Sequence, residues 1–231
     1  MVTEQKGARF SLEISGLIDD LNGPDYITDA YSDIGVNSLI ILRSVFRVDN
    51  SYLGSYLART ISANKGLVKG KDILDLGCGC GLLGLVCALN GARKVHFSDI
   101  NPVAVKNSRL NSILWEIGHA SFSAGGLFEN IPTRRRFDLI VFNPPSIEGI
   151  PLNSSEAAFI REDRVIQDFF RLFPNYLKKV GAVIIPGASR FNSDTSPINM
   201  VRRYNLPHKI IAKENEAGGD YKYVVFFSQE K

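Results

Sequence analysis

The sequence has no apolar run of the length that a membrane-spanning helix requires, about 20 residues, although 45% of its 231 residues are hydrophobic. Its first residues, Met-Val-Thr-Glu-Gln-Lys, also lack the apolar core of a secretory signal peptide. We therefore expect a cytoplasmic protein with no membrane partner. There is no internal repeat, and the length fits one large domain or one domain with an extension.

Cysteine is scarce, and neither sign of charge is in large excess. Cys78, Cys80 and Cys87 lie within ten residues of one another, and an odd number so closely spaced indicates reduced thiols rather than disulfides. Their spacing fits no common zinc site, so we expect no bound metal. The 27 Lys and Arg against 24 Asp and Glu give a net charge of +3, which permits a nucleic-acid partner without favouring one.

What the sequence does contain is a glycine-rich turn between two apolar runs. Residues 72–84 read Asp-Ile-Leu-Asp-Leu-Gly-Cys-Gly-Cys-Gly-Leu-Leu-Gly, and the apolar residues continue to Leu89 before Asn90-Gly91. This pattern predicts a buried strand, a tight turn and a helix that ends at a glycine. Because glycines let a ligand approach the backbone and a helix start offers free N–H groups, the stretch predicts a site for a nucleotide-like cofactor.

Two features indicate which cofactor binds. The Gly-x-Gly-x-x-Gly pattern from Gly79, with Asp99 beyond it, also matches the dinucleotide fingerprint, so a nicotinamide oxidoreductase is one alternative. However, Asp75 precedes the glycines, where it would repel a pyrophosphate and attract an ammonium group. Asn143-Pro144-Pro145 follows, where a dehydrogenase has no need of it. With these residues the chain resembles the class I S-adenosylmethionine-dependent methyltransferases over roughly residues 45–231.

Alternating strands and helices predict an α/β fold, a doubly wound and mostly parallel sheet, and the resemblance implies the seven-stranded Rossmann-like methyltransferase version of it. Strands are expected at residues 72–76, 94–99, 121–124, 137–143, 182–186, 209–214 and 221–229. Helices are expected at residues 81–90, 101–115 and 163–179, with a kink or break at Pro174, and from residue 196 onward. The last two strands form a hairpin, which makes the final strand antiparallel.

We expect residues 1–68 to form an N-terminal cap, with one or two short helices between residues 27 and 45, and residues 69–231 to form the cofactor-binding domain. Within the cap, residues 45–57 resemble the segment that precedes the glycine turn in small-domain methyltransferases acting on guanine amino groups. That resemblance implies that Phe46 borders the cofactor and that Gly54-Ser55 begins a helix beside it. An ordinary amphipathic helix with a buried phenylalanine explains the segment equally well.

The resemblance also implies roles for residues at the carboxyl ends of the central strands. Asp99 would accept hydrogen bonds from both ribose hydroxyls, Ile100 would pack on the adenine, and Asp75 would face the methionine amino group directly or through water. Backbone close to the cofactor would come from Gly77, Cys78, Gly79 and Gly81. Relatives often carry an acid before the Leu-Phe pair that follows the third strand. Here that position is glycine, so the adenine is expected to rely on backbone around Gly126 and Leu127.

Asn143-Pro144-Pro145-Ser146 resembles the Asn-Pro-Pro-aromatic motif of methyltransferases that act on planar amino groups, such as those of adenine, guanine and glutamine. Methyl transfer is an in-line displacement in which positioning dominates. The Asn143 side chain and the Pro144 carbonyl would accept both N–H groups of the acceptor, beside the cofactor, and Pro145 and Ser146 would contact the substrate. Prolines stiffen this backbone.

Ser146 replaces the aromatic residue that stacks on a flat acceptor in this motif. Either Tyr26, Tyr31 or Tyr52 of the cap supplies the stacking, or the acceptor is not flat. The second case includes small-molecule amines and transfer of the aminocarboxypropyl group of the cofactor instead of its methyl group.

The leading hypothesis is an S-adenosylmethionine-dependent N-methyltransferase whose acceptor is a protein side chain, a nucleobase or a small molecule. A non-catalytic binding module is a further alternative, although Asp75, Asp99 and Asn143 are all present. The lack of an added RNA-binding domain favours a protein or small-molecule acceptor. Residues 134–136, three successive arginines, fit a solvated loop better than a phosphate site.

Overall fold

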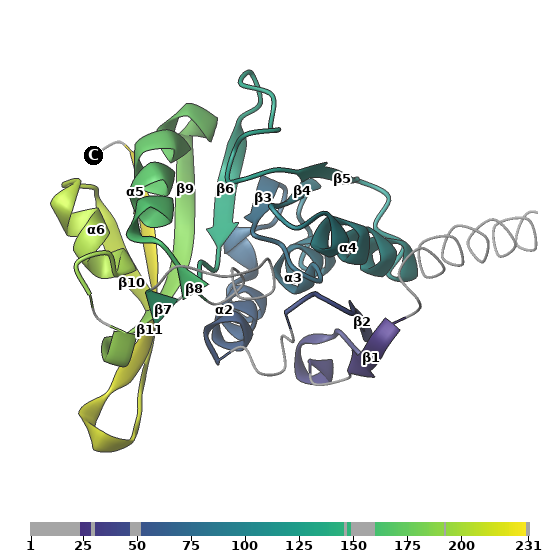
Figure 1. Cartoon of the computed structure of the whole chain (residues 1–231), viewed down its shortest axis with the longest axis horizontal. Helices are drawn as coiled ribbons and strands as arrows, with labels where there is room; N and C mark the ends of the chain where they lie inside the picture. The colour runs from purple at the N-terminus through teal and green to yellow at the C-terminus, as the bar shows by residue number, and fades with distance from the viewer. Residues whose placement is uncertain are drawn as a thin grey trace, which may run out of the picture.

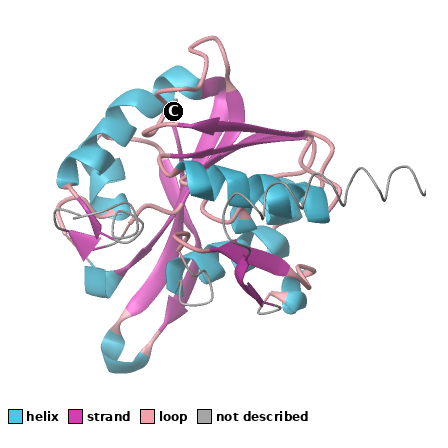
Figure 2. Ribbon diagram, turned by 45° about the vertical axis from the view of Figure 1, so that its right-hand side comes forward, coloured by secondary structure: helices cyan, strands magenta, loops and turns pink. Residues whose placement is uncertain are grey.

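The computed structural model describes residues 24–28, 31–46, 52–145, 147–148, 160–191 and 193–229. A seven-stranded sheet forms the centre, with helices on both faces (Figures 1 and 2). In chain order its strands are β3 (Asp72–Leu76), β4 (Lys94–Asp99), β5 (Ala120–Ala124), β6 (Phe137–Phe142), β9 (Leu177–Ala188), β10 (His208–Asn215) and β11 (Tyr221–Ser228).

Five α-helices and two small sheets surround this sheet in the described part of the chain. The helices are α2 (Tyr52–Ala63), α3 (Leu82–Leu89), α4 (Pro102–Leu114), α5 (Asp163–Leu172) and α6 (Pro197–Arg203). The 3₁₀ turns are η1 (Ser32–Ile34), η3 (Lys65–Leu67), η5 (Phe173–Tyr176), η6 (Ser189–Phe191) and η7 (Ala217–Gly219). The small sheets pair β1 (Pro24–Thr28) with β2 (Leu39–Leu42) and β7 (Ile147–Glu148) with β8 (Ile160–Arg161).

The order of the strands across the large sheet is β10-β11-β9-β6-β3-β4-β5, which confirms the predicted doubly wound, mostly parallel fold. Strands β3, β4, β5, β6 and β9 run parallel, and β11 lies antiparallel between β9 and β10. The chain therefore winds outward from β3 in both directions. Connections that leave β3 and β6 toward opposite sides open a crevice at the carboxyl ends of these strands, where ligands bind in such sheets.

The two faces of the sheet are covered differently. On one face, buried residues of β3, β4 and β6, among them Ile73, Phe97 and Val141, pack in one core with α2, α3, α4 and β2. On the other face, Leu74 and Ile140 pack with α5, η5 and α6. Residues 125–136, which join β5 to β6, contain no helix, so β4 and β5 carry a polar row on this second face instead of an apolar one. This row comprises His96, Ser98, Ser121 and Ser123.

The predicted elements need one correction between residues 163 and 188. The helix expected to reach residue 179 ends at Leu172, where the break expected at Pro174 takes the form of η5. Strand β9 then starts at residue 177, where Leu177 pairs with Phe137, and not at residue 182. A bulge separates this pair from Leu139 and Ala182. Glycine is required in this bulge because a Cβ on Gly181 would lie 2.9 Å from the carbonyl oxygens of Lys178 and Phe137.

The helices predicted between residues 27 and 45 were also wrong, because this part of the cap is a β-hairpin with one 3₁₀ turn. All four residues of β2 are buried, and its sequence Leu-Ile-Ile-Leu favours a strand. Two asparagines of α4 satisfy its backbone. Asn107 Oδ1 accepts from Leu42 N at 2.8 Å, and Asn111 Oδ1 accepts from Ile40 N at 2.9 Å. The helix predicted near Gly54 is present as α2.

Candidate active site

A cavity of about 770 Å³ lies at the carboxyl ends of β3, β4 and β6. Its walls come from the glycine turn after β3, the loops after β4, β5 and β6, the segment before α2, and one face of α5. The polar and charged side chains that line it are Ser44, Ser98, Asp99, Asn101, Glu129, Asn143, Glu162, Arg164, Asp168 and Tyr176. Four of these groups are carboxylates and one is a guanidinium, so the cavity favours a cationic ligand.

The glycine turn holds its backbone against the cavity. Gly77, Gly79 and Gly81 have φ angles of 68°, 54° and 91°, in the left-handed region that side chains rarely adopt. The N–H groups of Gly77 and Cys78 donate to the Ser98 carbonyl at 2.8 and 3.0 Å, which ties the turn to β4. Of the residues predicted to supply close backbone, Gly77, Cys78 and Gly79 line the cavity, whereas Gly81 does not.

Asp99 lies at the end of β4 with its carboxylate at the cavity wall. Oδ2 accepts from Gly79 N at 2.9 Å, and Oδ1 accepts from Asn101 N at 2.8 Å. Burial raises the pKa of this carboxyl, although these backbone hydrogen bonds act in the opposite direction. Each carboxylate oxygen can accept a second hydrogen bond, so the group still has capacity for a ligand. The neighbouring Ile100 lines the cavity with 64% of its surface exposed.

Asp75 lies behind the glycine turn and does not line the cavity. It is 1% exposed, and its Oδ2 accepts from Gly84 N, in the first turn of α3, at 2.8 Å. Its Oδ1 is buried and has no hydrogen-bond partner within the described residues. Burial raises the pKa of Asp75 to about 8; the hydrogen bond from Gly84 lowers it, and the charge of Asp99 adds a smaller increase. The Asp75 side chain therefore holds the start of α3 against the glycine turn and is no part of the cavity wall.

Two non-glycine residues with left-handed backbone also line the cavity, Ser44 with φ 68° and Leu127 with φ 45°. The Ser44 carbonyl accepts from Asn101 Nδ2 at 2.9 Å, while Asn101 Oδ1 caps α4 by accepting from Val103 N at 2.9 Å. This side chain fixes the segment that carries Phe46, which lines the cavity. The prediction that Phe46 borders the cofactor stays a prediction. Strained backbone of this kind concentrates at ligand sites.

The loop after β5 contributes an acid that the sequence comparison with the family motif did not predict. Glu129, two residues after Leu127, lines the cavity, and its Oε2 accepts from Gly126 N at 3.2 Å. Phe128 stacks on Tyr176 with 4.4 Å between ring centroids. The expected position for an acid was before the Leu-Phe pair; the carboxylate that the loop presents follows it instead.

Helix α5 supplies a wall of the cavity that we also did not predict. Glu162, Val165, Asp168 and Leu172 follow one another at helical spacing and all line the cavity. That spacing can be read from the sequence. Only the position of the helix over the carboxyl end of β6 shows that these residues face the cavity. Glu162 makes no ion pair within the described residues, whereas Asp168 accepts from Arg171 at 2.9 Å.

The Asn-Pro-Pro segment follows β6 directly. Asn143 and Pro145 line the cavity, and Pro144 faces a small neighbouring pocket beside Ile166. Within the described residues the Asn143 side chain makes no hydrogen bond. Ser146 lies outside the described residues.

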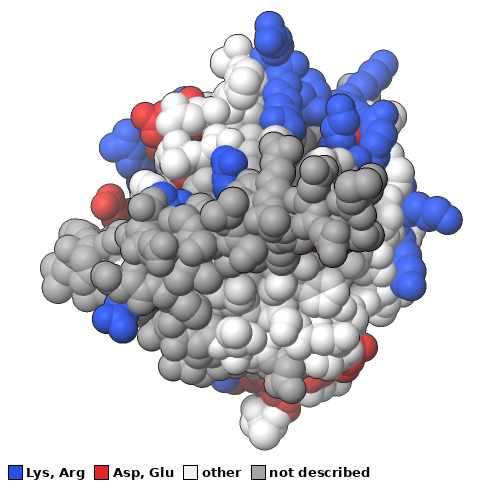
Figure 3. Space-filling model, turned by 90° about the vertical axis from the view of Figure 1, so that its right-hand side faces the viewer, with Lys and Arg blue, Asp and Glu red and all other residues white. Residues whose placement is uncertain are grey.

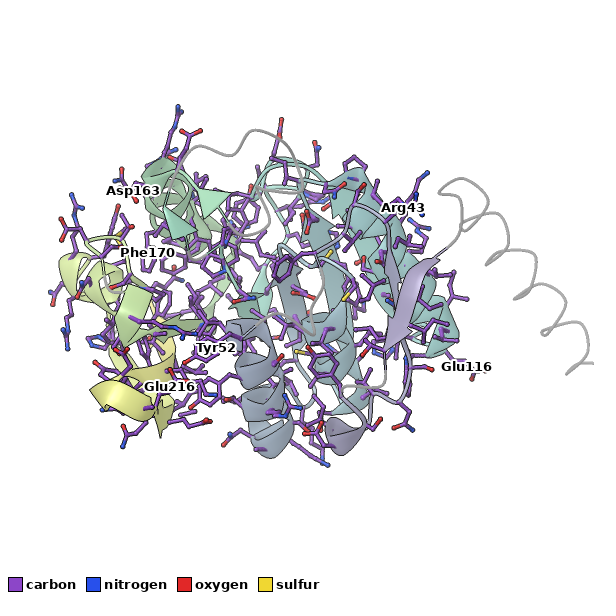
Figure 4. All side chains as sticks on the ribbon, turned by 60° about the horizontal axis from the view of Figure 1, so that its bottom comes forward. Arg43, Tyr52, Glu116, Asp163, Phe170 and Glu216 are labelled. Carbon is purple, nitrogen blue, oxygen red and sulfur yellow. The ribbon has the colours of Figure 1, made fainter. Side chains whose placement is uncertain are left out.

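Two of the three cap tyrosines named from the sequence, Tyr31 and Tyr52, lie outside the cavity. Tyr31 is 1% exposed and bonds Ser55 Oγ at 2.9 Å, away from the cavity. Tyr52 stands at the start of α2 toward the hairpin that carries Glu216 (Figure 4), under the guanidinium of Arg190 at 4.0 Å. Neither residue lines the cavity. The side chain of Tyr26 lies outside the described residues.

The remaining chemistry of the described residues is limited. All three cysteines are buried free thiols, and burial raises the pKa values of Cys78 and Cys87. No group of three or more His, Cys, Asp or Glu side chains that could hold a metal occurs among the residues the structure describes. Within the same residues no helix has the length and apolar character needed to cross a membrane.

The strand order, the glycine turn after β3, the acid at the end of β4 and the asparagine after β6 together define a class I methyltransferase. The chain belongs to the methyltransferase small domain family, whose model matches residues 38–204. It is an S-adenosylmethionine-dependent methyltransferase, as the sequence predicted.

Curated relatives carry related activities. A protein of Methanocaldococcus jannaschii described as a putative protein N5-glutamine methyltransferase is 37% identical over 156 residues, which cover 63% of this chain and 76% of that protein. The tRNA1(Val) (adenine(37)-N6)-methyltransferase of a Flavobacteriaceae bacterium is 34% identical over 95 residues, 41% of this chain and 40% of that protein. The second match thus spans less than half of its relative.

Solved structures share the fold at low sequence identity. The Thermus thermophilus 16S rRNA N2 G1207 methyltransferase, in complex with AdoMet and guanosine, has a TM-score of 0.59 at 19% identity, over 84% of this chain and 47% of that one. The ribosomal protein L11 methylase of Lactobacillus delbrueckii has a TM-score of 0.57 at 21% identity, over 81% and 82% of the two chains.

Proposed function

We propose that the protein binds S-adenosylmethionine in the cavity and transfers its methyl group to the side-chain nitrogen of a glutamine in a protein. The observation that carries this proposal is the Asn143 side chain, which lines the cavity after β6 and makes no hydrogen bond within the described residues. An amide placed in this way offers an oxygen and an NH₂ group to a carboxamide or another planar amino group. The name of the Methanocaldococcus jannaschii relative supports a glutamine acceptor.

The residues present fit the cofactor. The left-handed glycines leave a wall without Cβ atoms, and four carboxylates against one guanidinium suit a ligand that carries a positive sulfur and an ammonium group. Asp99 would hold the ribose hydroxyls, Ile100 and Leu127 would pack on the adenine, and Glu129 would accept from the adenine amino group. Gly77, Cys78 and Gly79 would contact the methionine portion through their backbone, with Asp75 supporting the turn from behind.

The cofactor supplies an electrophilic methyl group on a good leaving group, so the protein's task is to aim the acceptor nitrogen. Asn143 Oδ1 and the Pro144 carbonyl would accept the N–H groups of the acceptor and turn the nitrogen lone pair toward the cavity. Pro144 and Pro145 limit the motion of this backbone. Carboxamides are neutral at neutral pH, so no general base is needed before attack, and the proton leaves the product to water or to Glu162.

The test incubates the protein and S-adenosylmethionine with a radioactive methyl group in a cell extract depleted of small molecules. The measurement is the radioactivity transferred to macromolecules. We expect the label in macromolecules to resist ribonuclease, to be released by protease, and to appear as one added methyl group on glutamine by peptide mass spectrometry. Label that ribonuclease releases would assign a nucleobase acceptor and overturn the glutamine proposal. Formation of methylthioadenosine in place of S-adenosylhomocysteine would instead show transfer of the aminocarboxypropyl group.

A further inference from the structure

Lysines and arginines gather at the amino ends of four neighbouring parallel strands, β9, β6, β3 and β4. We call this the basic edge and define it by the three residues before each strand and the first three within it. Its cations are Lys69, Lys71, Arg93, Lys94, Arg134, Arg135, Arg136, Lys178 and Lys179, and its acids are Asp72 and Asp138. Nine cations against two carboxylates give a net charge of +7, which leaves the rest of the chain, at +3 in total, with −4.

The two carboxylates are already occupied by cations of the edge. Asp72 binds Arg93 at 2.6 Å and Lys178 at 3.2 Å, and Asp138 binds the same lysine at 2.7 Å. Arg135 turns inward and contacts His96 at 3.0 Å. The other six cations make no ion pair within the residues the structure describes, so those residues leave their charge without a direct counter-charge. They are Lys69, Lys71, Lys94, Arg134, Arg136 and Lys179.

Helix dipoles do not account for this excess. The C-terminal ends of α2, α3 and α5 lie at this side of the sheet and attract cations, but each carries only about half a negative charge. Six cations without an ion pair among the described residues therefore outweigh the helix dipoles and leave a strongly positive surface. Figure 3 shows Lys and Arg side chains gathered along its upper part, which corresponds to the amino end of β6 at the top of Figure 1.

The basic edge lies at the end of the sheet opposite the cavity. Strand β4 has six residues and runs from one to the other, a distance of about 20 Å. The edge is therefore no part of the methyl-transfer site, and a ligand there leaves the cavity open. Four adjacent strands span about 14 Å across the edge, a length over which a nucleic-acid duplex carries about eight phosphate charges.

We propose that the basic edge binds the phosphate backbone of double-stranded RNA and holds the enzyme on an RNA-containing assembly while the opposite end acts on its acceptor. A protein reads bases in the DNA major groove by inserting a helix or a β-ribbon, and the basic edge has neither. Its cations therefore suit contact with the phosphate backbone of a nucleic acid. Duplex RNA is recognised mainly in this way, by shape and phosphate contacts. Of the large apolar side chains exposed in the described residues, Leu89, Val180 and Tyr204 come from elements that begin or end at this side, too few for insertion into a membrane.

The experiment measures binding of the full chain to a fluorescent RNA duplex of about 20 base pairs across a series of salt concentrations. We expect a steep fall of affinity with salt, with a slope of log K against log salt of about −3 to −5 for up to six phosphate contacts. The test variant is Arg134→Gln/Arg136→Gln. The matched control is Arg202→Gln/Arg203→Gln, a pair of exposed arginines at the end of α6 that also make no ion pair within the described residues.

The test variant should weaken RNA binding roughly tenfold and reduce the slope by about 1–2, whereas the control variant should bind as the wild type does. Equal loss in both variants, no RNA binding at low salt, or binding to phosphatidylserine vesicles in place of RNA would each overturn the proposal. Stronger binding to a DNA duplex of the same length would also overturn it. Cofactor binding, measured on the same samples, should be unchanged in both variants. A failure of the RNA-binding proposal can therefore be distinguished from a failure of the proposed methyl transfer.

Discussion

The Asp99 carboxylate accepts a hydrogen bond from the backbone N–H of Gly79 at 2.9 Å. This contact joins the end of β4 to the glycine turn that follows β3, so the acid and the turn form one continuous wall of the cavity. This wall is held together by contacts within the protein alone. Several measurements test how much each part of it contributes.

Replacement of Asp99 should weaken cofactor binding. If Asp99 holds the ribose as proposed, Asp99→Ala removes two charge-assisted hydrogen bonds, and we expect a loss of about 2–4 kcal/mol of binding free energy. Isothermal titration with S-adenosylhomocysteine measures this loss, and Asp99→Asn, which keeps one acceptor oxygen, should lose less. Asp194→Ala, at an exposed position outside the cavity, is the control. Unchanged affinity in a folded Asp99→Ala protein would rule out the ribose role.

Replacement of Glu129 should weaken recognition of the adenine amino group in particular. We expect Glu129→Ala to lower affinity for S-adenosylhomocysteine by about tenfold, the loss of one hydrogen bond to a charged group. Binding of S-inosylhomocysteine, which lacks the amino group, should not change. Glu116→Ala, at the far end of α4 (Figure 4), is the matched control. An equal loss for both ligands would assign Glu129 to the loop structure alone.

Replacement of Asn143 should reduce turnover and spare cofactor binding. Asn143→Ala removes one preorganised polar contact to the acceptor, for which we expect a fall in kcat of roughly 10²-fold or more. Asn143→Asp should retain more activity with a carboxamide acceptor, because a carboxylate still accepts N–H groups. It should retain less with a basic amine, which the carboxylate would hold in its protonated, unreactive form. Wild-type turnover in Asn143→Ala would contradict the role.

The stability of the protein should depend on pH through Asp75. Its pKa is raised to about 8 in the folded protein, so the unfolded chain releases this proton at lower pH and folding loses stability as pH rises from about 4 to 8. Between pH 5 and 7 this contribution amounts to about 2.5 kcal/mol. Asp75→Asn cannot ionise, so its denaturant midpoint should rise relative to the wild type across this range. A constant difference between the two proteins would contradict the shift.

His96 should produce the opposite dependence. Burial lowers the pKa of His96 to about 4, with a smaller contribution from the charge of Arg135. The unfolded histidine takes up a proton below its ordinary pKa near 6.5, so stability falls as pH drops from about 6.5 toward 4. We expect a loss of about 2 kcal/mol between pH 7 and 5 that is absent in His96→Gln. Chemical denaturation of both proteins at the two pH values measures this difference.

The sequence was most informative where a function restricts the residue type. The left-handed glycines of the turn, the acid that ends β4 and the asparagine after β6 each require a particular residue at a particular distance, and the structure brings Gly77, Asp99 and Asn143 to one cavity. The central strands were predicted closely because a fully buried strand is apolar throughout.

The sequence was less informative where tertiary contacts determine the secondary structure or the position of a side chain. The apolar run of β2 fits a buried helix or a strand equally well, and the asparagines that favour the strand lie about 65–71 residues away in α4. The early start of β9 depends on the partner strand that Leu177 meets, which its own segment does not reveal. The place of Glu129 likewise depends on a left-handed turn at Leu127, a conformation that leucine seldom adopts.

The connection from β5 to β6 reaches from the cavity to the basic edge. It consists of residues 125–136, about the dozen residues that a connection between parallel strands requires, and it contains no helix. One end of this connection lines the cavity, and the other carries Arg134 and Arg136 to the basic edge. An insertion or deletion within it would displace residues at both places, so a change in the length of this one segment affects the cavity and the basic edge together.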